Sequence, residues 1–218
     1  MQVINLGEKQ SILNKFISEL RDVSIQSDRM RFRRNIERIG EVLGYELSKS
    51  LSYNKVDIKT PLGTSECIIP EEDIVICSIL RAGLPLHQGL LNYFDQAENT
   101  FISAYRHHIS ETEFEIKVEY LASPSLDNKV LILADPMLAT GRSFVNVYKA
   151  LKSMGTPKEI HLASVIGSEQ GVAHIAEYFP EDTKLWIATV DKELNENGYI
   201  VPGLGDAGDL AYGIKLQH

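Results

Sequence analysis

A single aspartate follows a run of apolar residues in the stretch LILADPMLATGRS, residues 131–143. Asp135 comes directly after the run, a proline bends the chain, and residues 140–143 lead into helical spacing. A carboxylate at this place can accept hydrogen bonds from hydroxyl groups such as those of a ribose. Backbone N–H groups at a helix start, beside Thr and Ser hydroxyls, suit a phosphate. The stretch therefore predicts a site for a polar, phosphorylated ligand.

Two common phosphate motifs are absent from this stretch. No GxGxxG pattern follows the apolar run, and residues 141–143 lack the lysine of a P-loop. Taken alone, the stretch is equally compatible with an ordinary turn between a strand and a helix. Polar groups that follow other strands decide between the two interpretations.

Two arginines follow other apolar runs. Arg81 lies in SILRAG, residues 78–83, where it could contact a diphosphate while Gly83 permits close approach of the backbone. Arg106 ends the tripeptide AYR. Each arginine alone is explained by ordinary surface charge. Three strand ends with compatible groups indicate one binding site.

Glycine is concentrated near the carboxyl terminus. Five glycines fall in the sixteen residues 198–213, GYIVPGLGDAGDLAYG. The segment looks too irregular for a helix and too long for a simple turn. Long ordered loops in compact domains are usually functional, so we expect this segment to contribute to the site.

Short β-branched runs alternate with helical segments after Pro70. The pattern predicts helices near 84–94, 143–154 and 169–178, and strands at 73–80, 100–105, 129–135, 159–166 and 184–190. The alternation predicts an α/β fold with a doubly wound, mainly parallel five-stranded sheet. Ligands of such sheets bind beyond the carboxyl ends of the strands, where Arg81, Arg106 and Asp135 would lie.

Residues 1–70, which precede this pattern, show no alternation of buried strands and helices. Apolar spacing predicts two helices, at 8–21 and 28–51, with Asp28 as N-cap of the second. Alternation on both sides of Pro61-Leu62-Gly63 predicts a β-hairpin. We expect one domain over residues 1–218, divided into N-terminal helices (1–52), a small hairpin appendage (53–70), an α/β core (71–190) and a loop with the C-terminus (191–218).

Composition narrows the function further. The 218 residues are 44% hydrophobic and 24% charged, as in soluble globular proteins, and the net charge of -8 argues against nucleic acid or an anionic membrane as main partner. No apolar run approaches the roughly 20 residues of a membrane span, and no leader is recognised. Cys67 and Cys77 are expected to be buried, reduced thiols in a cytoplasmic protein.

Four motifs in this order resemble uracil phosphoribosyltransferases: ILRAG, YR, DPMLATGRS and NENGYIVPGLGDAGD. The resemblance runs from residue 74 to residue 216, and RFR at 31–33 is similar more loosely. It implies a type I phosphoribosyltransferase fold. It also implies transfer of the 5-phosphoribosyl group from phosphoribosyl diphosphate to uracil, which gives UMP and diphosphate in pyrimidine salvage.

The resemblance implies a part for each matching residue. Asp135 would contact the ribose hydroxyls, and Asp206 would orient the base or assist loss of its N1 proton, so these are the candidate catalytic carboxylates. The residues implied to bind phosphoribosyl diphosphate are Arg81, Arg106, Asp135, Pro136, Met137, Leu138, Ala139, Thr140, Gly141, Arg142 and Ser143. Those implied to bind uracil are Tyr199, Ile200, Gly205, Asp206 and Ala207.

Cofactor and partners are implied in the same way. Mg2+ would be held mainly by the diphosphate, with no protein ligand assigned, which lets an acidic protein bind an anionic substrate. Uracil and phosphoribosyl diphosphate are the expected partners, GTP is an expected effector, and a homo-oligomer of at least two copies is expected. No nucleic acid and no membrane partner is expected.

Three features depart from the family pattern. Arg142 stands where a second glycine is usual, SEQG at 168–171 replaces Ala-Pro-Glu-Gly, and the arm at 107–120 differs in spacing. The sequence assigns no role to this arm.

Two other functions stay open. A pyrimidine-sensing, RNA-binding regulator with the same fold would need a basic face, and the acidic composition argues against one. A phosphoribosyltransferase for another base is the second alternative. The motif NGYIVPGLGDAGD argues against it, because other phosphoribosyltransferases do not share this motif.

Overall fold

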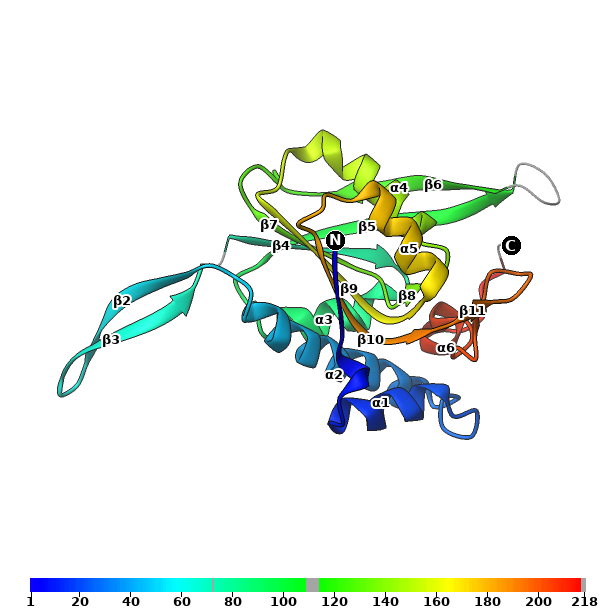
Figure 1. Ribbon diagram of the computed structural model, residues 1–218, viewed down its shortest axis with the longest axis horizontal. Helices are drawn as coiled ribbons and strands as arrows, with labels where there is room; N and C mark the ends of the chain where they lie inside the picture. The colour runs from blue at the N-terminus through cyan, green and yellow to red at the C-terminus, as the bar shows by residue number, and fades with distance from the viewer. Residues whose placement is uncertain (72, 109–113, 217–218) are drawn as a thin grey trace.

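The computed structural model describes residues 1–71, 73–108 and 114–216, and for 104–108 and 114–119 the backbone only. A central sheet carries helices on both faces (Figure 1). In chain order the elements are β1 (Gln2–Asn5), η1 (Leu6–Glu8), α1 (Ile12–Arg21), α2 (Arg29–Ser48), β2 (Tyr53–Thr60), β3 (Gly63–Pro70), β4 (Ile74–Leu80), α3 (Gly83–Leu91), β5 (Glu98–His108), β6 (Phe114–Ala122), β7 (Val130–Ala134), β8 (Met137–Leu138), α4 (Arg142–Leu151), η2 (Lys152–Met154), β9 (Glu159–Ser168), α5 (Glu169–Tyr178), β10 (Lys184–Asp191), β11 (Glu193–Leu194), β12 (Ile200–Val201) and α6 (Ala207–Tyr212).

The central sheet confirms the doubly wound, mainly parallel topology. Its strands follow the order β1-β10-β9-β7-β4-β5-β6, with β8 paired to β9, which makes eight strands in the described residues. The β5–β6 pair is antiparallel and the others are parallel. The predicted five strands are its central members, and β1, β6 and β8 extend the prediction. Strands as short as β1 and β8 contain too few residues for a periodic signal.

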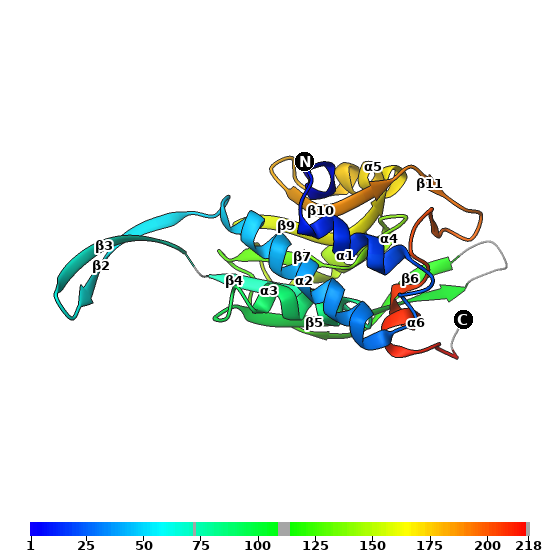
Figure 2. The ribbon, with the colours of Figure 1, turned by 90° about the horizontal axis from the view of Figure 1, so that it is seen from below.

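Alternate residues of β7 enter two separate hydrophobic layers. Val130, Ile132 and Ala134 pack in the layer formed with α1, α2 and α3, which cross one face of the sheet in Figure 2. Leu131 and Leu133 pack in the layer formed with α4 and α5 on the other face. Because both faces are covered, all five residues of β7 are buried.

Side-chain caps determine where the first two helices begin. Ser11 caps α1 by accepting a hydrogen bond from Leu13 N at 3.2 Å, so the helix begins at Ile12 and not at residue 8 as predicted. Asp28 caps α2 as predicted, because its carboxylate accepts a hydrogen bond from Arg31 N at 3.1 Å. The second helix ends at Ser48, three residues earlier than predicted.

Two antiparallel pairs project from the body at opposite ends in Figure 1. The β2–β3 hairpin occupies residues 53–70, with Tyr53 opposite Pro70. Cys67 on β3 is only half-buried, which corrects the prediction of a buried thiol, whereas Cys77 is buried and both are free. The β5–β6 pair contains the arm predicted at 107–120, of which residues 109–113 lie outside the described part of the chain.

No helix in the described ranges combines the length and apolar character needed to cross a membrane.

A histidine is buried within the sheet. His161 on β9 is 0% exposed, and its Nδ1 accepts a hydrogen bond from the Trp186 indole at 3.0 Å. Its Nε2 lies 3.1 Å from Glu159 Oε1. Burial lowers the pKa of His161 to about 4, although the Glu159 carboxylate acts in the opposite direction. The imidazole is therefore neutral at neutral pH.

We predict that His161 makes the free energy of unfolding fall when the pH is lowered from 7.5 to 5. The effect is read as a difference from a variant at this position, because Asp135, whose pKa burial raises to about 7, acts in the opposite direction over the same range. The unfolded His161 takes up a proton near its ordinary pKa of 6.5, whereas the buried imidazole does so only near pH 4. Stability from this group is thus present above pH 6.5 and lost as the pH falls toward 4, by about 2 kcal/mol at pH 5. Urea denaturation measures the change.

The matched variant is His161→Gln, which keeps an acceptor for the Trp186 indole but does not titrate. Between pH 7.5 and 5 the free energy of unfolding of this variant should rise by about 2 kcal/mol relative to that of the wild type. Equal slopes in the two proteins would contradict the assignment to His161.

Candidate active site

The candidate site lies at the carboxyl ends of β4 and β7, where the strand order reverses. The chain leaves β4 toward β5 on one side and later returns through β7 on the other. Ser78 pairs with Ala134, so Arg81 and Asp135 follow neighbouring strand ends. The two ends touch, since a Cβ at Gly83 would lie 3.4 Å from Ala134 O. Open α/β sheets bind ligands at such a reversal.

Asp135 is a carboxylate buried at the end of an apolar strand. It is 8% exposed, and its Oδ1 accepts a hydrogen bond from Met137 N at 3.2 Å. Burial raises the pKa of Asp135 to about 7, with the Met137 hydrogen bond acting weakly in the other direction. The charged form therefore lacks enough donors, and a ligand that brings hydroxyl groups would supply them.

The start of α4 offers donors for an anion. Gly141 is its N-cap, with a left-handed φ of 74°, and no side chain caps the first turn. Thr140 Oγ1 accepts only a long hydrogen bond of 3.5 Å from Arg142 N. Residues 139–143, here called the phosphate loop, therefore present backbone N–H groups and the positive end of the helix dipole.

The start of α5 supports the phosphate loop. Ser168 Oγ donates to Ala139 O at 2.7 Å and accepts from Gly171 N at 2.8 Å. A Cβ at Gly171 would lie 2.2 Å from Ala139 O, so only glycine permits this approach. Thus the SEQG departure from the family pattern keeps the loop in place through a serine hydroxyl. Sequence reasoning did not assign this function to Ser168.

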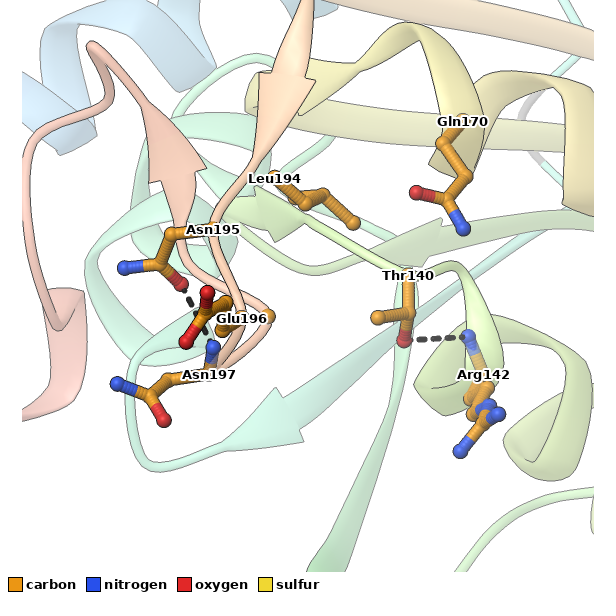
Figure 3. A pocket seen from close by; sticks show the side chains of 8 residues that line it. Thr140, Arg142, Gln170, Leu194, Asn195, Glu196 and Asn197 are labelled. Carbon is orange, nitrogen blue, oxygen red and sulfur yellow. Dashed lines mark hydrogen bonds between the residues drawn. The ribbon is translucent and has the colours of Figure 1, made fainter.

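A cavity of about 270 Å³ adjoins the phosphate loop. Figure 3 shows Thr140 and Arg142 on one side and Asn195 to Asn197 on the other. Asn195 shapes the second side, because its Oδ1 accepts hydrogen bonds from Asn197 N at 3.0 Å and Tyr199 N at 2.9 Å. The lining residues are Thr140, Arg142, Gln170, Leu194, Asn195, Glu196, Asn197 and Gly198. Sequence reasoning missed Gln170 and residues 194–198, although NEN begins the motif NENGYIVPGLGDAGD.

Ile200 directs its backbone polar groups away from the neighbouring strand. Asn195 N donates to Tyr199 O at 2.9 Å, and Leu194 is the partner of Ile200 in the β11–β12 pair. Hydrogen-bonded and non-bonded pairs alternate in antiparallel strands, so Leu194 and Ile200 form a non-bonded pair. The N–H and C=O groups of Ile200 therefore point away from β11, and the carbonyl oxygen lies close to Gly203.

The glycine-rich segment contains more regular structure than its sequence indicates. It holds β12 and the short helix α6, which corrects the expectation that it is too irregular for a helix. Gly205 adopts a φ of 94°, and a Cβ there would meet only Leu210 Cδ1, at 3.7 Å. Close approach occurs instead at Gly203, whose Cβ would lie 1.9 Å from Ile200 O. Ala207, the first residue of α6, is buried in the hydrophobic core.

Asp206 is the N-cap of α6. Its Oδ1 accepts a hydrogen bond from Asp209 N at 3.0 Å, and its Oδ2 accepts one from Lys215 Nζ at 3.1 Å. Burial acts to raise the pKa of Asp206, but these hydrogen bonds outweigh it and leave the pKa below its ordinary value. The carboxylate is charged and orients the start of the helix.

The two arginines differ in what the structure describes. Arg81 Nη2 donates to Asp209 Oδ1 and to Gly213 O, both at 3.2 Å, so it faces α6. Arg106 lies on β5 opposite Ile116, at the same edge of the sheet, and its side chain lies outside the described atoms. No group of three or more His, Cys, Asp or Glu side chains suited to a metal is found in the ranges described.

Comparisons with known proteins cover nearly the whole chain. The model of the uracil phosphoribosyltransferase family matches residues 8–214. A uracil phosphoribosyltransferase of Porphyromonas gingivalis is 56% identical over 216 residues, with 99% of this chain and 100% of that protein covered. One of Thermococcus gammatolerans is 37% identical over 213 residues, with 96% and 93% covered.

One solved structure shares the fold over nearly the full length of both chains. The AQ2163 protein from Aquifex aeolicus superposes with a TM-score of 0.87 at 28% identity, with 99% of this chain and 100% of that chain covered. The family model and the sequence relatives show that the chain belongs to the uracil phosphoribosyltransferase family.

Proposed function

We propose that this protein transfers the 5-phosphoribosyl group of phosphoribosyl diphosphate to uracil and releases UMP and diphosphate. The observation that carries the proposal is the arrangement at one edge of the sheet. Asp135, the phosphate loop and the segment from Tyr199 to Ala207 belong to this edge, in a chain of the uracil phosphoribosyltransferase family.

Each part of the sugar phosphate has a matching group. The 5-phosphate would accept hydrogen bonds from N–H groups of the phosphate loop, including Ser143, and residues 136–138 would form the loop's entry. Asp135 would accept hydrogen bonds from the ribose hydroxyls. Arg81 and Arg106 would bind the diphosphate. Arg81 can exchange its contact with Asp209 for one with the diphosphate, because both side chains are partly exposed. Ion pairs of this kind contribute at most about 1 kcal/mol to stability.

The reaction forms a bond between uracil N1 and the anomeric carbon and breaks the bond from that carbon to the diphosphate oxygen. The electron pair of the broken bond leaves with the diphosphate, and the N1 proton passes to solvent. The chain contributes alignment and charge stabilisation. We assign Asp206 to orienting the base, since its lowered pKa and two hydrogen bonds make it a poor proton acceptor.

Mg2+ fits the donor chemistry of this edge. Mg2+ prefers oxygen ligands and usually binds through one or two carboxylates together with substrate phosphates. The Asp135 carboxylate lies at this edge, and its raised pKa indicates a site that favours a nearby positive charge. When bound, Mg2+ neutralises and orients the diphosphate. In our proposal the diphosphate supplies most of its ligands, and Asp135 holds the ribose hydroxyls.

Uracil would be read by backbone groups. It presents an acceptor, a donor and an acceptor along O2, N3–H and O4, and the outward groups of Ile200 can match part of this order. Gly205, with its φ of 94°, supplies a backbone conformation that other residues rarely adopt. Tyr199 is 43% exposed beside them.

The family resemblance supports three further proposals. We infer GTP as an effector, a homo-oligomer of at least two copies, and residence in the cytoplasm.

The central experiment measures product formation. Purified protein with phosphoribosyl diphosphate and Mg2+ should convert uracil to UMP, and EDTA should abolish the product. Cytosine has an acceptor at N3 and a donor at the 4-position, where uracil has a donor and an acceptor. Two backbone groups that pair with uracil would therefore each face a group of their own kind in cytosine. At roughly 1–3 kcal/mol for each unsatisfied group, kcat/KM should favour uracil by on the order of 30-fold to 10⁴-fold. Chromatography of the products decides. Absence of UMP with Mg2+ present would refute the enzyme proposal and favour the RNA-binding regulator.

Asp135 should give the reaction a pH dependence. Because burial raises its pKa to about 7, the carboxylate that accepts ribose hydroxyls is lost as the pH falls below that value. We expect kcat/KM for phosphoribosyl diphosphate to fall about tenfold per pH unit below pH 7 and to level off above it.

The substrate phosphates also titrate, so Asp135→Asn serves as the control. This variant should lose about 1.5–3 kcal/mol of transition-state stabilisation. Its kcat/KM for phosphoribosyl diphosphate should also fall less steeply below pH 7 than that of the wild type. If kcat/KM falls as steeply below pH 7 in Asp135→Asn as in the wild type, the pH dependence belongs to the substrate.

Support of the phosphate loop by α5 is tested with two glycines. In Gly171→Ala the new Cβ would meet Ala139 O at 2.2 Å and displace the loop, so KM for phosphoribosyl diphosphate should rise at least about tenfold. Gly63→Ala is the matched control, because a Cβ there meets nothing within 4 Å. Steady-state kinetics with circular dichroism as a check on folding measure the effect. Equal KM values in the two variants would show that α5 does not position the loop.

A further inference from the structure

An arginine–aspartate pair contacts the base loop, defined here as residues 199–206. Arg21 is the last residue of α1, and Asp191 is the last residue of β10. Nη1 of the arginine donates to Oδ2 and Nη2 donates to Oδ1, both at 2.7 Å. Two parallel hydrogen bonds fix the orientation of both groups as well as their distance.

This pair holds both backbone polar groups of Gly203. Gly203 O accepts a hydrogen bond from Arg21 Nη1 at 3.0 Å, and Gly203 N donates to Asp191 Oδ2 at 2.9 Å. The side chains of Arg21 and Asp191 are 24% and 9% exposed, so little water competes. Burial acts to raise the pKa of Asp191, but the hydrogen bonds from Arg21 and Gly203 outweigh it and keep the carboxylate charged.

Gln26 holds the next residue of the base loop. Its Nε2 donates to Leu204 O at 3.2 Å and to Leu20 O at 2.8 Å. Residues 203 and 204 are thus tied to β10, to the end of α1 and to the connection between α1 and α2. These are parts of the chain that the assigned substrate contacts do not include.

Gly203 passes this constraint on to Ile200. A Cβ at Gly203 would lie 1.9 Å from Ile200 O, so the two backbones are in direct contact. A displacement of Gly203 must therefore move the carbonyl of Ile200, whose backbone we assign to uracil. The ion pair is in this way connected to the atoms that distinguish one base from another.

We propose that Arg21 and Asp191 are positioning residues that set the backbone of the base loop for reading uracil. The inference rests on the proposed function and deepens it. It places part of the base selectivity in contacts between α1, β10 and Gly203, on side chains that do not touch the base.

Kinetics of Arg21→Gln and Asp191→Asn test the proposal. In each variant the KM for uracil should rise at least about tenfold, while the KM for phosphoribosyl diphosphate changes less than about threefold. The preference for uracil over cytosine should narrow. The double variant should resemble the single ones, because the two side chains act as a unit. Arg21→Lys keeps the charge but loses the two-pronged contact, so its effect should be intermediate.

Arg31→Gln is the matched control. Arg31 Nη1 lies 3.3 Å from Glu19 Oε2, in an ion pair that joins α2 to α1 and not to the base loop. Both KM values of this variant should stay within about twofold of the wild type. It removes the same charge from the same helical layer as Arg21→Gln does.

Hydrogen exchange without substrate gives a readout that does not depend on activity. The Gly203 amide should exchange at least about tenfold faster in Arg21→Gln and Asp191→Asn than in the wild type and in Arg31→Gln. A wild-type KM for uracil in both pair variants would overturn the proposal, whatever the exchange rates. A parallel rise of both KM values would also overturn it, because that pattern indicates only a structural role.

Failure of the proposed function gives a different result. A wild-type protein that forms no UMP would overturn that function together with the base-reading part of this inference. The exchange rates would still decide whether Arg21 and Asp191 order the base loop.

Discussion

Burial of β7 on both faces is the constraint on which the rest of the site depends. Its five residues are all apolar and buried, so the chain can place its first polar group only after Ala134. That group, Asp135, remains mostly buried, and its pKa is raised to about 7 for this reason. The connection that follows pairs with β9 and contacts α5 before α4 begins, since Met137 is opposite Ile166 and a Cβ at Gly141 would lie 2.9 Å from Gly171 O. The Asp135 carboxylate has few hydrogen-bond donors around it, and the N–H groups at the start of α4 have few acceptors. The two are placed next to each other.

In the proposed site the substrates are bound mostly by backbone atoms, and backbone atoms need external support. Side chains from other elements supply it on both sides of the site. Ser168 and Gly171 hold Ala139 in the phosphate loop, whereas Arg21, Asp191 and Gln26 hold Gly203 and Leu204. The glycines differ in what they contribute: Gly171 and Gly203 permit contact with a carbonyl oxygen, while Gly205 supplies a left-handed φ without a crowded neighbour.

The sequence was sufficient for the centre of the fold and for the prediction that Arg81 and Asp135 follow neighbouring strand ends. Five buried strands, the helices between them and the hairpin all follow from apolar periodicity, which depends on neighbours within a few residues. The sequence was insufficient where the deciding partner is distant in the chain. Asp135 and Asp191 both end apolar strands, and sequence reasoning selected only the first. What separates them is Arg21, 170 residues from Asp191, and no local pattern reveals such a partner.

The two arginine–aspartate pairs of the site differ in function because they differ in burial. Arg21 and Asp191 are 24% and 9% exposed and make a two-pronged contact, so separating them would leave a poorly solvated charge. Arg81 and Asp209 are 44% and 25% exposed and share a single contact of 3.2 Å, which water can replace at little cost. The first pair is therefore suited to holding a loop in one conformation. In our proposal the second pair keeps a guanidinium oriented until an anion with more charge displaces Asp209, which would allow a protein with a net charge of -8 to bind a diphosphate locally.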